Sequence, residues 1–200
     1  MMEAMHNMNP NGRGFRVPMP SGIYVYPEDP RPEEFRIYDV AHKLAFQCRY
    51  GGGVTHFYSI AEHCVLGTEK IEHKFKLDFL LHDRAEAWLQ DFMRPLKMKA
   101  QPWYGELERR VERVSAPVWG IKDPMPGEVV TLDYRLCIDE KQQLYRPEFT
   151  TENHLEEGEP VGITCACMDP YEARDVFLET YGYLTGDYSW KEHWISPRRF

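Results

Sequence analysis

The chain has 200 residues, of which 42% are hydrophobic and 28% are charged, and its formal net charge is −8 at pH 7. This length and composition predict one soluble globular domain that buries a core of its own. The acidic balance argues against a protein that wraps extended nucleic acid, because such binding depends on a cationic surface. The sequence has no apolar run of roughly 18 residues and no apolar segment of the secretory kind, so we expect no membrane span and predict the cytoplasm as the compartment.

The first quarter of the chain predicts an arm, a β-like piece and a helix. Residues 1–20 are rich in Met, Asn, Gly and Pro without a period, which predicts a flexible or loosely docked arm before a single domain over residues 21–200. Residues 22–26 alternate like a short strand. Apolar residues then recur at helical spacing over 40–45, and the three glycines at 51–53 must end that helix.

The next two predicted helices carry the polar motifs. Ser59 and Glu62 fit a capping box, so a helix is expected to begin there with His63 in its first turn. An apolar stripe from Phe75 to Leu89 predicts one helix that carries residues 82 and 83 and ends at Pro95.

Three more helices complete an all-α prediction. They are expected over about 104–118, stopped by Gly120, over about 128–145, closed by Pro147, and from an Asp169 cap toward Gly186. Residues 148–168 are acidic and irregular, with 161–164 as a candidate short strand. The predicted fold is therefore a single, mainly helical bundle without an internal repeat.

The adjacent pair His82–Asp83, followed by Glu86, is the most informative motif. An imidazole nitrogen beside a carboxylate oxygen suits Mn, Fe, Co, Ni or Zn better than Ca. On the predicted helix Glu86 lies one turn beyond His82 and on the same face. Glu86 is therefore a candidate base beside a metal-bound water, and Asp91, just past that helix, either shares this role or caps the loop.

Such a metal site needs further ligands from elsewhere in the chain. His63 is the best candidate because it lies at the fixed start of a capped helix. Asp133 is the natural fourth ligand, since it interrupts an apolar helix face where an unpaired carboxylate is costly to bury. The rival histidines that this reasoning leaves open are His42, His56 and His73.

An ordered series of segments resembles the HD-domain phosphohydrolases of bacteria and phages, closest to the phage dATP triphosphohydrolases and more distantly the bacterial 5′-deoxynucleotidases. The resemblance covers about residues 21–184. It rests on segments 39–42, 48–52, 57–63, 80–83 with Glu86, 94–97, and Asp133 with Glu140. The chain departs from these relatives after the arginine, where Gly53-Val54-Thr55 and then His56 replace their common Gly-His-Thr, so a role for His56 is left open.

The resemblance implies an all-helical fold that holds one divalent ion, with Zn, Co, Mn, Ni or Fe as candidates. The implied ligands are His63, His82, Asp83 and Asp133. Glu86, with Asp91 behind it, would then position or deprotonate the water that attacks phosphorus. Arg49 and Lys97 are candidates to bind the phosphates, or else to form structural ion pairs. A second ion such as Mg, bound with the substrate phosphates, is left open.

Base recognition is assigned to aromatic residues near the motifs. Tyr24, Tyr26 and Tyr50 offer faces on which a base can stack. Such residues are more often part of a core, so both interpretations are kept. The specific hypothesis is that the segment Ile23–Tyr26 forms one wall of the base pocket.

The resemblance implies hydrolysis of a small deoxynucleotide, with dATP favoured and nucleoside plus triphosphate as products. One alternative is a 5′-nucleotidase acting on deoxynucleoside monophosphates, and another is a nucleotide-binding module without turnover. No membrane or extended nucleic acid is expected as a partner. If the chain is phage-encoded, the compartment is the host cytoplasm. Relatives tend to assemble, so a homo-oligomer is expected, with contacts through exposed aromatic residues such as Tyr188, Trp190 and Trp194.

Overall fold

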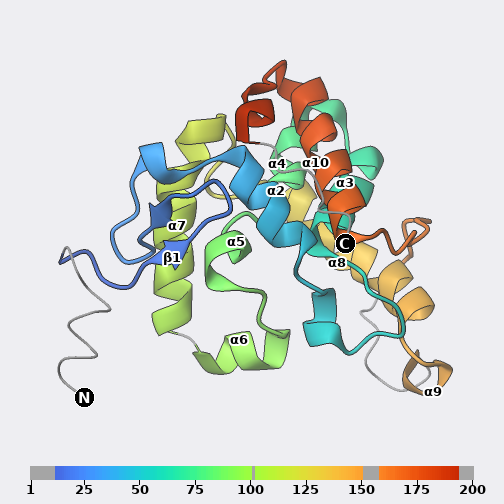
Figure 1. The fold of residues 1–200 in the computed structure, drawn as a ribbon. Coiled ribbons are helices and arrows are strands. Elements are labelled where there is room, and N and C mark those ends of the chain that lie inside the picture. The colour runs from blue at the N-terminus through green and yellow to red at the C-terminus, as the bar shows by residue number, and fades with distance from the viewer. Residues whose placement is uncertain (1–11, 101, 151–157, 194–200) are drawn as a thin grey trace, which may run out of the picture.

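The computed structural model describes residues 12–100, 102–150 and 158–193, and these form a mainly α-helical fold, as predicted (Figure 1). None of the described helices combines the length and the apolar character needed to cross a membrane. The helices are α2 (Ile37–Ala45), α3 (Ile60–Lys70), α4 (Lys76–Leu80), α5 (Glu86–Leu89), α6 (Arg94–Ala100), α7 (Trp103–Trp119), α8 (Gly127–Leu144), α9 (Pro147–Thr150) and α10 (Pro170–Thr185).

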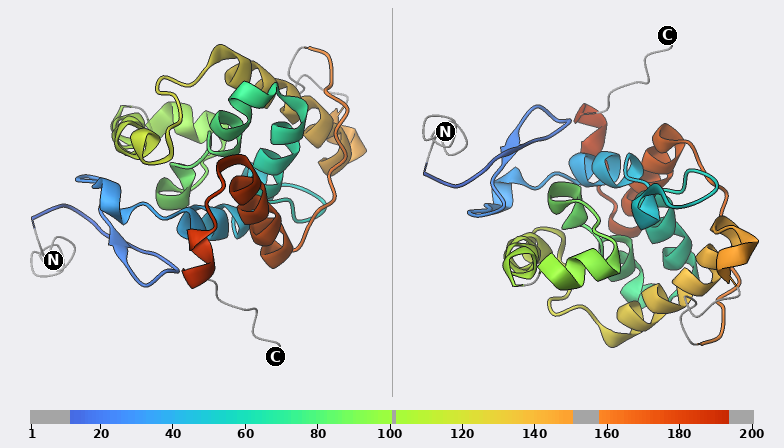
Figure 2. Two further views of the ribbon diagram at one scale, coloured as in Figure 1. Left: turned by 90° about the horizontal axis from the view of Figure 1, so that it is seen from above. Right: turned by 90° about the horizontal axis from the view of Figure 1, so that it is seen from below.

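The helices pack around α2 and α3. Helix α10 packs on both of them, α5 packs on α2, and α3 contacts α4 and α8. Helix α7 lies on one side of the molecule and α8 with α9 on the opposite side, as the ribbon views show (Figures 1 and 2). The buried apolar side chains form a larger cluster around α2, α3, α5, α7 and α10, and a smaller one between α4 and α8.

The predicted β-like piece is confirmed, and it ties down part of the expected arm. Strand β2 (Tyr24–Val25) pairs antiparallel with β1 (Val17–Pro18). The side chain of Met19 is buried, and Arg13 forms an ion pair with Glu34. Residues 12–20 are therefore docked on the domain rather than flexible, and residues 1–11 lie outside the described part of the chain.

The predicted single helix over 75–95 is wrong. Helix α4 ends at Leu80, and His82 and Asp83 lie in a turn before α5. The helix stops because the carbonyl of Leu81 accepts hydrogen bonds from the backbone N–H and the guanidinium of Arg84, in place of the next helical N–H. Arg84 is drawn into the core, where it also donates to Ser115 Oγ and the Glu112 carbonyl of α7.

The expected stop at Pro95 is also wrong. Helix α5 ends at Gln90, whose backbone takes a left-handed φ of 69°. Pro95 is the second residue of a new helix, α6, where its missing N–H leaves no helical bond unmade. The sequence rule for proline therefore marks the start of an element here rather than its end.

Half of the predicted capping box is confirmed. The Ser59 hydroxyl accepts from the Glu62 N–H at the start of α3. The Glu62 carboxylate does not return to Ser59 but accepts from the backbone N–H groups of Ala166, Cys167 and Met168 at 2.7 to 3.0 Å. A contact more than 100 positions away in the chain has replaced the local one.

The candidate strand at 161–164 is not a strand. Residues 159–168, here called the strap, have no regular secondary structure and no ladder partner in the described structure, and Gly162 and Cys167 within the strap take positive φ angles of 77° and 55°. Side chains hold its backbone instead: Asp139 accepts from Val161 and Gly162, and Gln143 bonds to Ile163 and Cys165.

The later helices agree with prediction at their ends. Gly120 ends α7 in the left-handed conformation, and Asp169 caps α10 by accepting from the Tyr171 and Glu172 N–H groups. Among the C-terminal aromatic residues, Trp190 is buried in the core rather than exposed, because it packs with the larger hydrophobic cluster. Trp194 lies outside the described residues.

Gly67 allows α3 to approach α4 and α8 closely. A Cβ at this position would overlap the ring of Phe79 and lie 2.7 Å from Leu136 Cδ1. We predict that Gly67→Ala lowers the free energy of unfolding by about 1–3 kcal/mol through overpacking, a loss of about 2–4 °C in Tm per kcal/mol. Thermal unfolding followed by circular dichroism measures this loss.

Gly127→Ala is the matched control, because a Cβ there has no atom within 4 Å. This variant should keep or slightly raise the Tm, since alanine favours the helix that begins at Gly127. Equal Tm values for the two variants would contradict the close approach at Gly67.

Candidate metal centre

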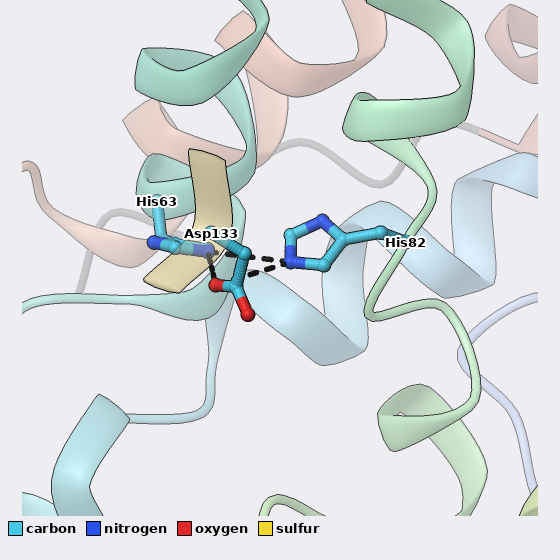
Figure 3. A group of neighbouring side chains, drawn as sticks. All are labelled: His63, His82 and Asp133. Carbon is cyan, nitrogen blue, oxygen red and sulfur yellow. Dashed lines mark hydrogen bonds and ion pairs between the residues drawn. The ribbon is translucent and has the colours of Figure 1, made fainter. Parts of the chain in front are cut away.

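The side chains of His63, His82, Asp83 and Asp133, here called the four-residue cluster, converge from three parts of the chain. His63 comes from α3, the adjacent pair from the turn after α4, and Asp133 from α8. His63 Nε2 lies 3.0 Å from Asp133 Oδ1 and 3.4 Å from His82 Nε2. His82 Nε2 lies 3.5 Å from Asp133 Oδ1 and 3.3 Å from Asp83 Oδ1. Figure 3 shows the two imidazoles and Asp133 pointing toward one another.

The outer nitrogen of each imidazole is held by the protein. His63 Nδ1 lies 2.5 Å from Glu140 Oε1, and His82 Nδ1 lies 2.7 Å from the carbonyl oxygen of Phe79. Both partners accept hydrogen bonds, so each Nδ1 carries the proton and each Nε2 presents its lone pair to the cluster. Metal-ligating histidines are held in this way, by a carboxylate or a carbonyl on the far nitrogen.

The spacing of these atoms fits a divalent ion. Ligand atoms about 2.1 Å from one ion lie roughly 3.0–3.4 Å from each other, in octahedral or tetrahedral geometry. The atom pairs listed above fall between 3.0 and 3.5 Å. Two imidazole nitrogens and two carboxylate oxygens are also a donor set that Zn and its first-row neighbours accept.

Carboxylates around the two imidazoles shift their pKa values upward. Burial lowers the pKa of His82, but Asp83 and Asp133 raise it by more than burial lowers it. The pKa of His82 is therefore well above its ordinary value. The same balance, with Glu140 in place of Asp83, leaves the pKa of His63 raised. The cluster thus attracts positive charge at Nε2, which a proton or a metal ion can satisfy.

Glu140 is the residue that the sequence reasoning left without a role. Its side chain is fully buried, and besides His63 it accepts from the hydroxyls of Tyr50 (2.5 Å) and Tyr58 (2.8 Å). Burial raises the pKa of Glu140, but Arg49 and His63 lower it by more than burial raises it, so the pKa falls to about 2. Glu140 lies seven residues after Asp133, two helical turns along the same face, and this spacing was the available signal.

Arg49 lies beside the cluster, as a phosphate-binding residue would, but it is already paired. Its guanidinium lies 3.3 Å from Asp83 Oδ2, 3.3 Å from Glu140 Oε2 and 4.0 Å from Asp133 Oδ1. These carboxylates keep the Arg49 pKa raised despite burial. The structure therefore supports both interpretations of this residue, a site cation and an ion-pair partner.

Glu86 and Asp91 lie in the α5 region, next to the turn that carries His82 and Asp83. Burial, with the charges of Asp83 and Asp91, holds the pKa of Glu86 well above its ordinary value, and burial also raises the pKa of Asp91. Glu86 Oε2 is buried and has no hydrogen-bond partner among the described residues. A carboxylate in this state readily accepts a proton from a bound molecule.

Lys97 extends from α6 toward Glu86. Its Nζ lies 3.7 Å from Glu86 Oε1 and 2.5 Å from Glu108 Oε1, and the side chain is 30% exposed. Lys97 thus lies beside Glu86, as expected of a residue of the candidate site, and Glu108 partly balances its charge. The side chain of Arg94, another residue of the basic segment, lies outside the described part.

The predicted aromatic residues take different places. Tyr50 has its hydroxyl on Glu140 and its ring edge-on to Tyr145, with a left-handed φ of 58°. Tyr24 is half-exposed in β2 beneath the guanidinium of Arg16, and no described contact joins it to the four-residue cluster. Tyr26 is buried beneath Arg13. The role of the segment Ile23–Tyr26 as one wall of a base pocket stays a prediction.

The rival histidines lie outside the four-residue cluster. His42 stacks on Phe46 at 4.4 Å, and burial with the charge of Arg174 lowers its pKa to about 4. His56 is exposed and bonds to its neighbour Thr55, and His73 is exposed before α4. Among the described residues, the possible ligand groups are His63 with His82 and Asp133, and His82 and Asp83 with the buried thiol of Cys64.

Surface hollows do not coincide with this cluster. Two of them, of about 540 and 520 Å³, lie between the N-terminal segment and α7, and between α3, α4 and α10. None of the cluster residues lines either hollow. The chemistry of the converging side chains, rather than a large cavity, identifies the candidate site.

Comparison with known proteins relates the chain to proteins of bacteria. No family model matches it. Over 124 residues it is 32% identical to the uncharacterized protein YfdR of Escherichia coli, an alignment that covers 62% of this chain and 69% of YfdR. It is 34% identical over 110 residues to the uncharacterized protein RCAP_rcc00048 of Rhodobacter capsulatus, covering 50% of this chain and 56% of that protein. The identity to YfdR, over more than two thirds of its length, shows that the chain belongs to the same protein family as YfdR.

Proposed function

We propose that the chain is a metal-dependent phosphohydrolase of small deoxynucleotides. The observation that carries this proposal is the convergence of the His63 and His82 Nε2 atoms with an Asp133 oxygen at 3.0 to 3.5 Å, with Asp83 beside His82 and the far side of each imidazole fixed by an acceptor. His63, His82 and Asp133 form one group of possible ligands, and Asp83 adjoins this group through His82 Nε2.

His63, His82, Asp83 and Asp133 would hold one divalent ion, with Zn, Co, Mn, Ni or Fe as candidates. When bound, such an ion acidifies water and polarises phosphoryl oxygens. Glu140 keeps the His63 imidazole in the required tautomer and orientation. A second ion such as Mg, arriving with the substrate phosphates, is part of the same proposal.

Glu86 and Asp91 are the proposed proton acceptors. Hydrolysis of a phosphate ester needs a group that aims the attacking water and takes its proton. The buried Glu86 Oε2 is free of described protein partners, and burial raises the pKa of this carboxyl group, which strengthens it as a proton acceptor. The pKa of Asp91 is also raised, and this residue either shares the role of Glu86 or receives the proton from Glu86.

Arg49 and Lys97 are the proposed phosphate-binding cations. Both lie beside site carboxylates and neither is surrounded by protein alone, with 11% and 30% of their side chains exposed. A polyphosphate would compete with Asp83 for Arg49 and with Glu108 for Lys97. Arginine offers a planar fork to a phosphate, whereas lysine acts as a point charge.

The substrate favoured within this class is dATP, cleaved to deoxyadenosine and triphosphate, and this preference rests on the resemblance of the motifs. A 5′-nucleotidase acting on deoxynucleoside monophosphates is the alternative with the same chemistry, and a nucleotide-binding module without turnover is the alternative without it. We also propose that the chain works in the cytoplasm and assembles as a homo-oligomer.

Product analysis tests the proposed reaction. Chain loaded with Mn²⁺ is incubated with each deoxynucleoside mono- and triphosphate, and the products are separated by chromatography. Deoxyadenosine plus triphosphate from dATP supports the proposal, and phosphate from monophosphates alone supports the 5′-nucleotidase. Absence of turnover with every nucleotide would contradict enzymatic function and favour the binding module.

We predict that Glu86→Gln retains bound metal but loses turnover by about 10²- to 10⁴-fold, since the amide cannot take a proton. Elemental analysis and initial rates measure the two effects separately. A Glu128→Gln variant, altered on the exposed first turn of α8, is the matched control and should keep the wild-type rate. Wild-type turnover in Glu86→Gln would remove this residue from the proposed chemistry.

We predict that His63→Ala and Asp133→Ala each lose the bound divalent ion, because each removes a donor atom from the four-residue cluster. Elemental analysis after dialysis against a weak chelator measures metal per chain. His73→Ala, which changes an exposed histidine outside the cluster, should retain the wild-type metal content. Equal metal content in all three variants would show that the ion binds elsewhere.

We predict that Glu140→Gln weakens metal binding by about 10- to 100-fold, because the amide no longer accepts a charge-assisted bond from His63 Nδ1. Competition titration with a fluorescent chelator measures the change in affinity. Glu148→Gln, an exposed substitution in α9, serves as the control. An affinity equal to that of the wild type would contradict the role of Glu140 behind His63.

A further inference from the structure

Gln47 lies where three segments of the candidate site meet. It follows the end of α2, precedes Arg49 by two residues, and accepts the Ile60 N–H at the start of α3 through its backbone carbonyl. Its side chain extends in the other direction, toward α5. One residue thus joins the arginine segment, the His63 helix and the segment that carries both proposed proton acceptors.

The Gln47 amide bonds to the backbone at both ends of the α5 segment. Its Nε2 donates to the carbonyl of Glu86 at 3.0 Å and to that of Lys43 at 3.1 Å. Its Oε1 accepts from the N–H of Asp91 at 3.1 Å. Glu86 and Asp91 are the first and last residues of the bonded segment, and both carry proposed catalytic carboxylates.

The segment between these bonds is not held by regular structure. Helix α5 is one turn long, and it ends at Gln90 with φ 69° and ψ 152°, a conformation that non-glycine residues rarely adopt. Such a backbone persists only when surrounding contacts fix it. Tyr104 donates to the Gln90 carbonyl, and Gln47 bonds to the neighbouring Asp91 N–H.

We propose that Gln47 is a positioning residue, which sets Glu86 and Asp91 relative to the four-residue cluster by bonding to the backbone of both. The effect of Gln47 on catalysis rests on the proposed function. Its effect on the position of the α5 segment rests on the three hydrogen bonds alone. Gln47 makes none of the described contacts with the cluster itself, so it acts through the two carboxylate residues.

The amide is suited to this place because it presents a donor and an acceptor at once. Leucine has a similar size and offers neither group, so Gln47→Leu removes all three bonds. Glutamate keeps the acceptor for Asp91 but offers no amide donor to the carbonyls of Glu86 and Lys43. The two variants therefore separate the Asp91 bond from the Glu86 bond.

Asp78→Asn supplies a matched control at a distance from this segment. The Asp78 carboxylate also fixes a backbone N–H remote in the chain, that of Lys122, at 2.8 Å, and it bonds the Lys122 ammonium. Weakening this contact perturbs the packing of α4 against the loop between α7 and α8 and involves no residue of α5. It therefore reports the general effect of loosening a side-chain bond to the backbone.

The test uses the full chain loaded with Mn²⁺ and two readouts. Hydrogen exchange measured by mass spectrometry reports the backbone amides of residues 90–92, and initial rates with dATP give kcat and KM. In Gln47→Leu we expect faster exchange confined to the α5 segment, unchanged metal content, a kcat lower by roughly ten- to a hundredfold, and a similar KM. In Gln47→Glu the exchange at Asp91 should stay slow while kcat falls.

Two results would overturn the proposal. Unchanged exchange over residues 90–92 in Gln47→Leu shows that Gln47 does not hold the segment, whether or not the chain hydrolyses nucleotides. Faster exchange in Gln47→Leu with the wild-type kcat shows that the hydrogen bonds of Gln47 do not matter to catalysis. An equal loss of kcat in Gln47→Leu and Asp78→Asn shows the same. If the wild type hydrolyses no nucleotide, the proposed function fails, and the exchange comparison still decides the structural half of the proposal.

Discussion

The buried contact between His63 and Glu140 is the interaction on which the candidate site depends. Both side chains are fully excluded from solvent, and 2.5 Å separates His63 Nδ1 from Glu140 Oε1. The contact joins α3 to α8, fixes the rotation of the imidazole and turns Nε2 toward the cluster. Two tyrosine hydroxyls and Arg49 complete the surroundings of Glu140, so its charge is balanced without water. Removing any of these donors leaves a buried charge less satisfied.

Helices α3 and α8 also hold the strap, through the residues that come directly before His63 and Glu140 in the chain. Glu62, next to His63, accepts three backbone N–H groups of the strap, and Asp139, next to Glu140, accepts two more. Successive residues on a helix point about 100° apart, so each pair faces the cluster with one side chain and the strap with the other. The strap and the cluster are thus positioned by the same two helices, although the strap contributes none of the four cluster residues.

The sequence predicts elements well where their signals are local. The caps at Ser59 and Asp169 and the stop at Gly120 need only neighbouring residues, and all three are confirmed. The sequence fails where a distant partner decides. Arg84 breaks the expected motif helix because α7 offers its guanidinium a buried hydroxyl and a carbonyl, and Glu62 leaves its capping box for the strap. The four cluster residues could be named from the sequence through their motifs and the family resemblance, whereas the contact of Glu140 with His63 requires the packing of two helices.

The charges around the cluster explain why a cation suits it. Asp83, Asp133, Glu140, Glu86 and Asp91 bring five carboxyl groups together, while Arg49 and Lys97 are the described cations paired with them. Burial makes this surplus of negative charge unfavourable. The pKa values of Glu86, of Asp91 and of both imidazoles are therefore raised. Protons and a metal ion are alternative ways to meet the same demand. A divalent ion bound at the cluster would meet this demand without engaging Glu86.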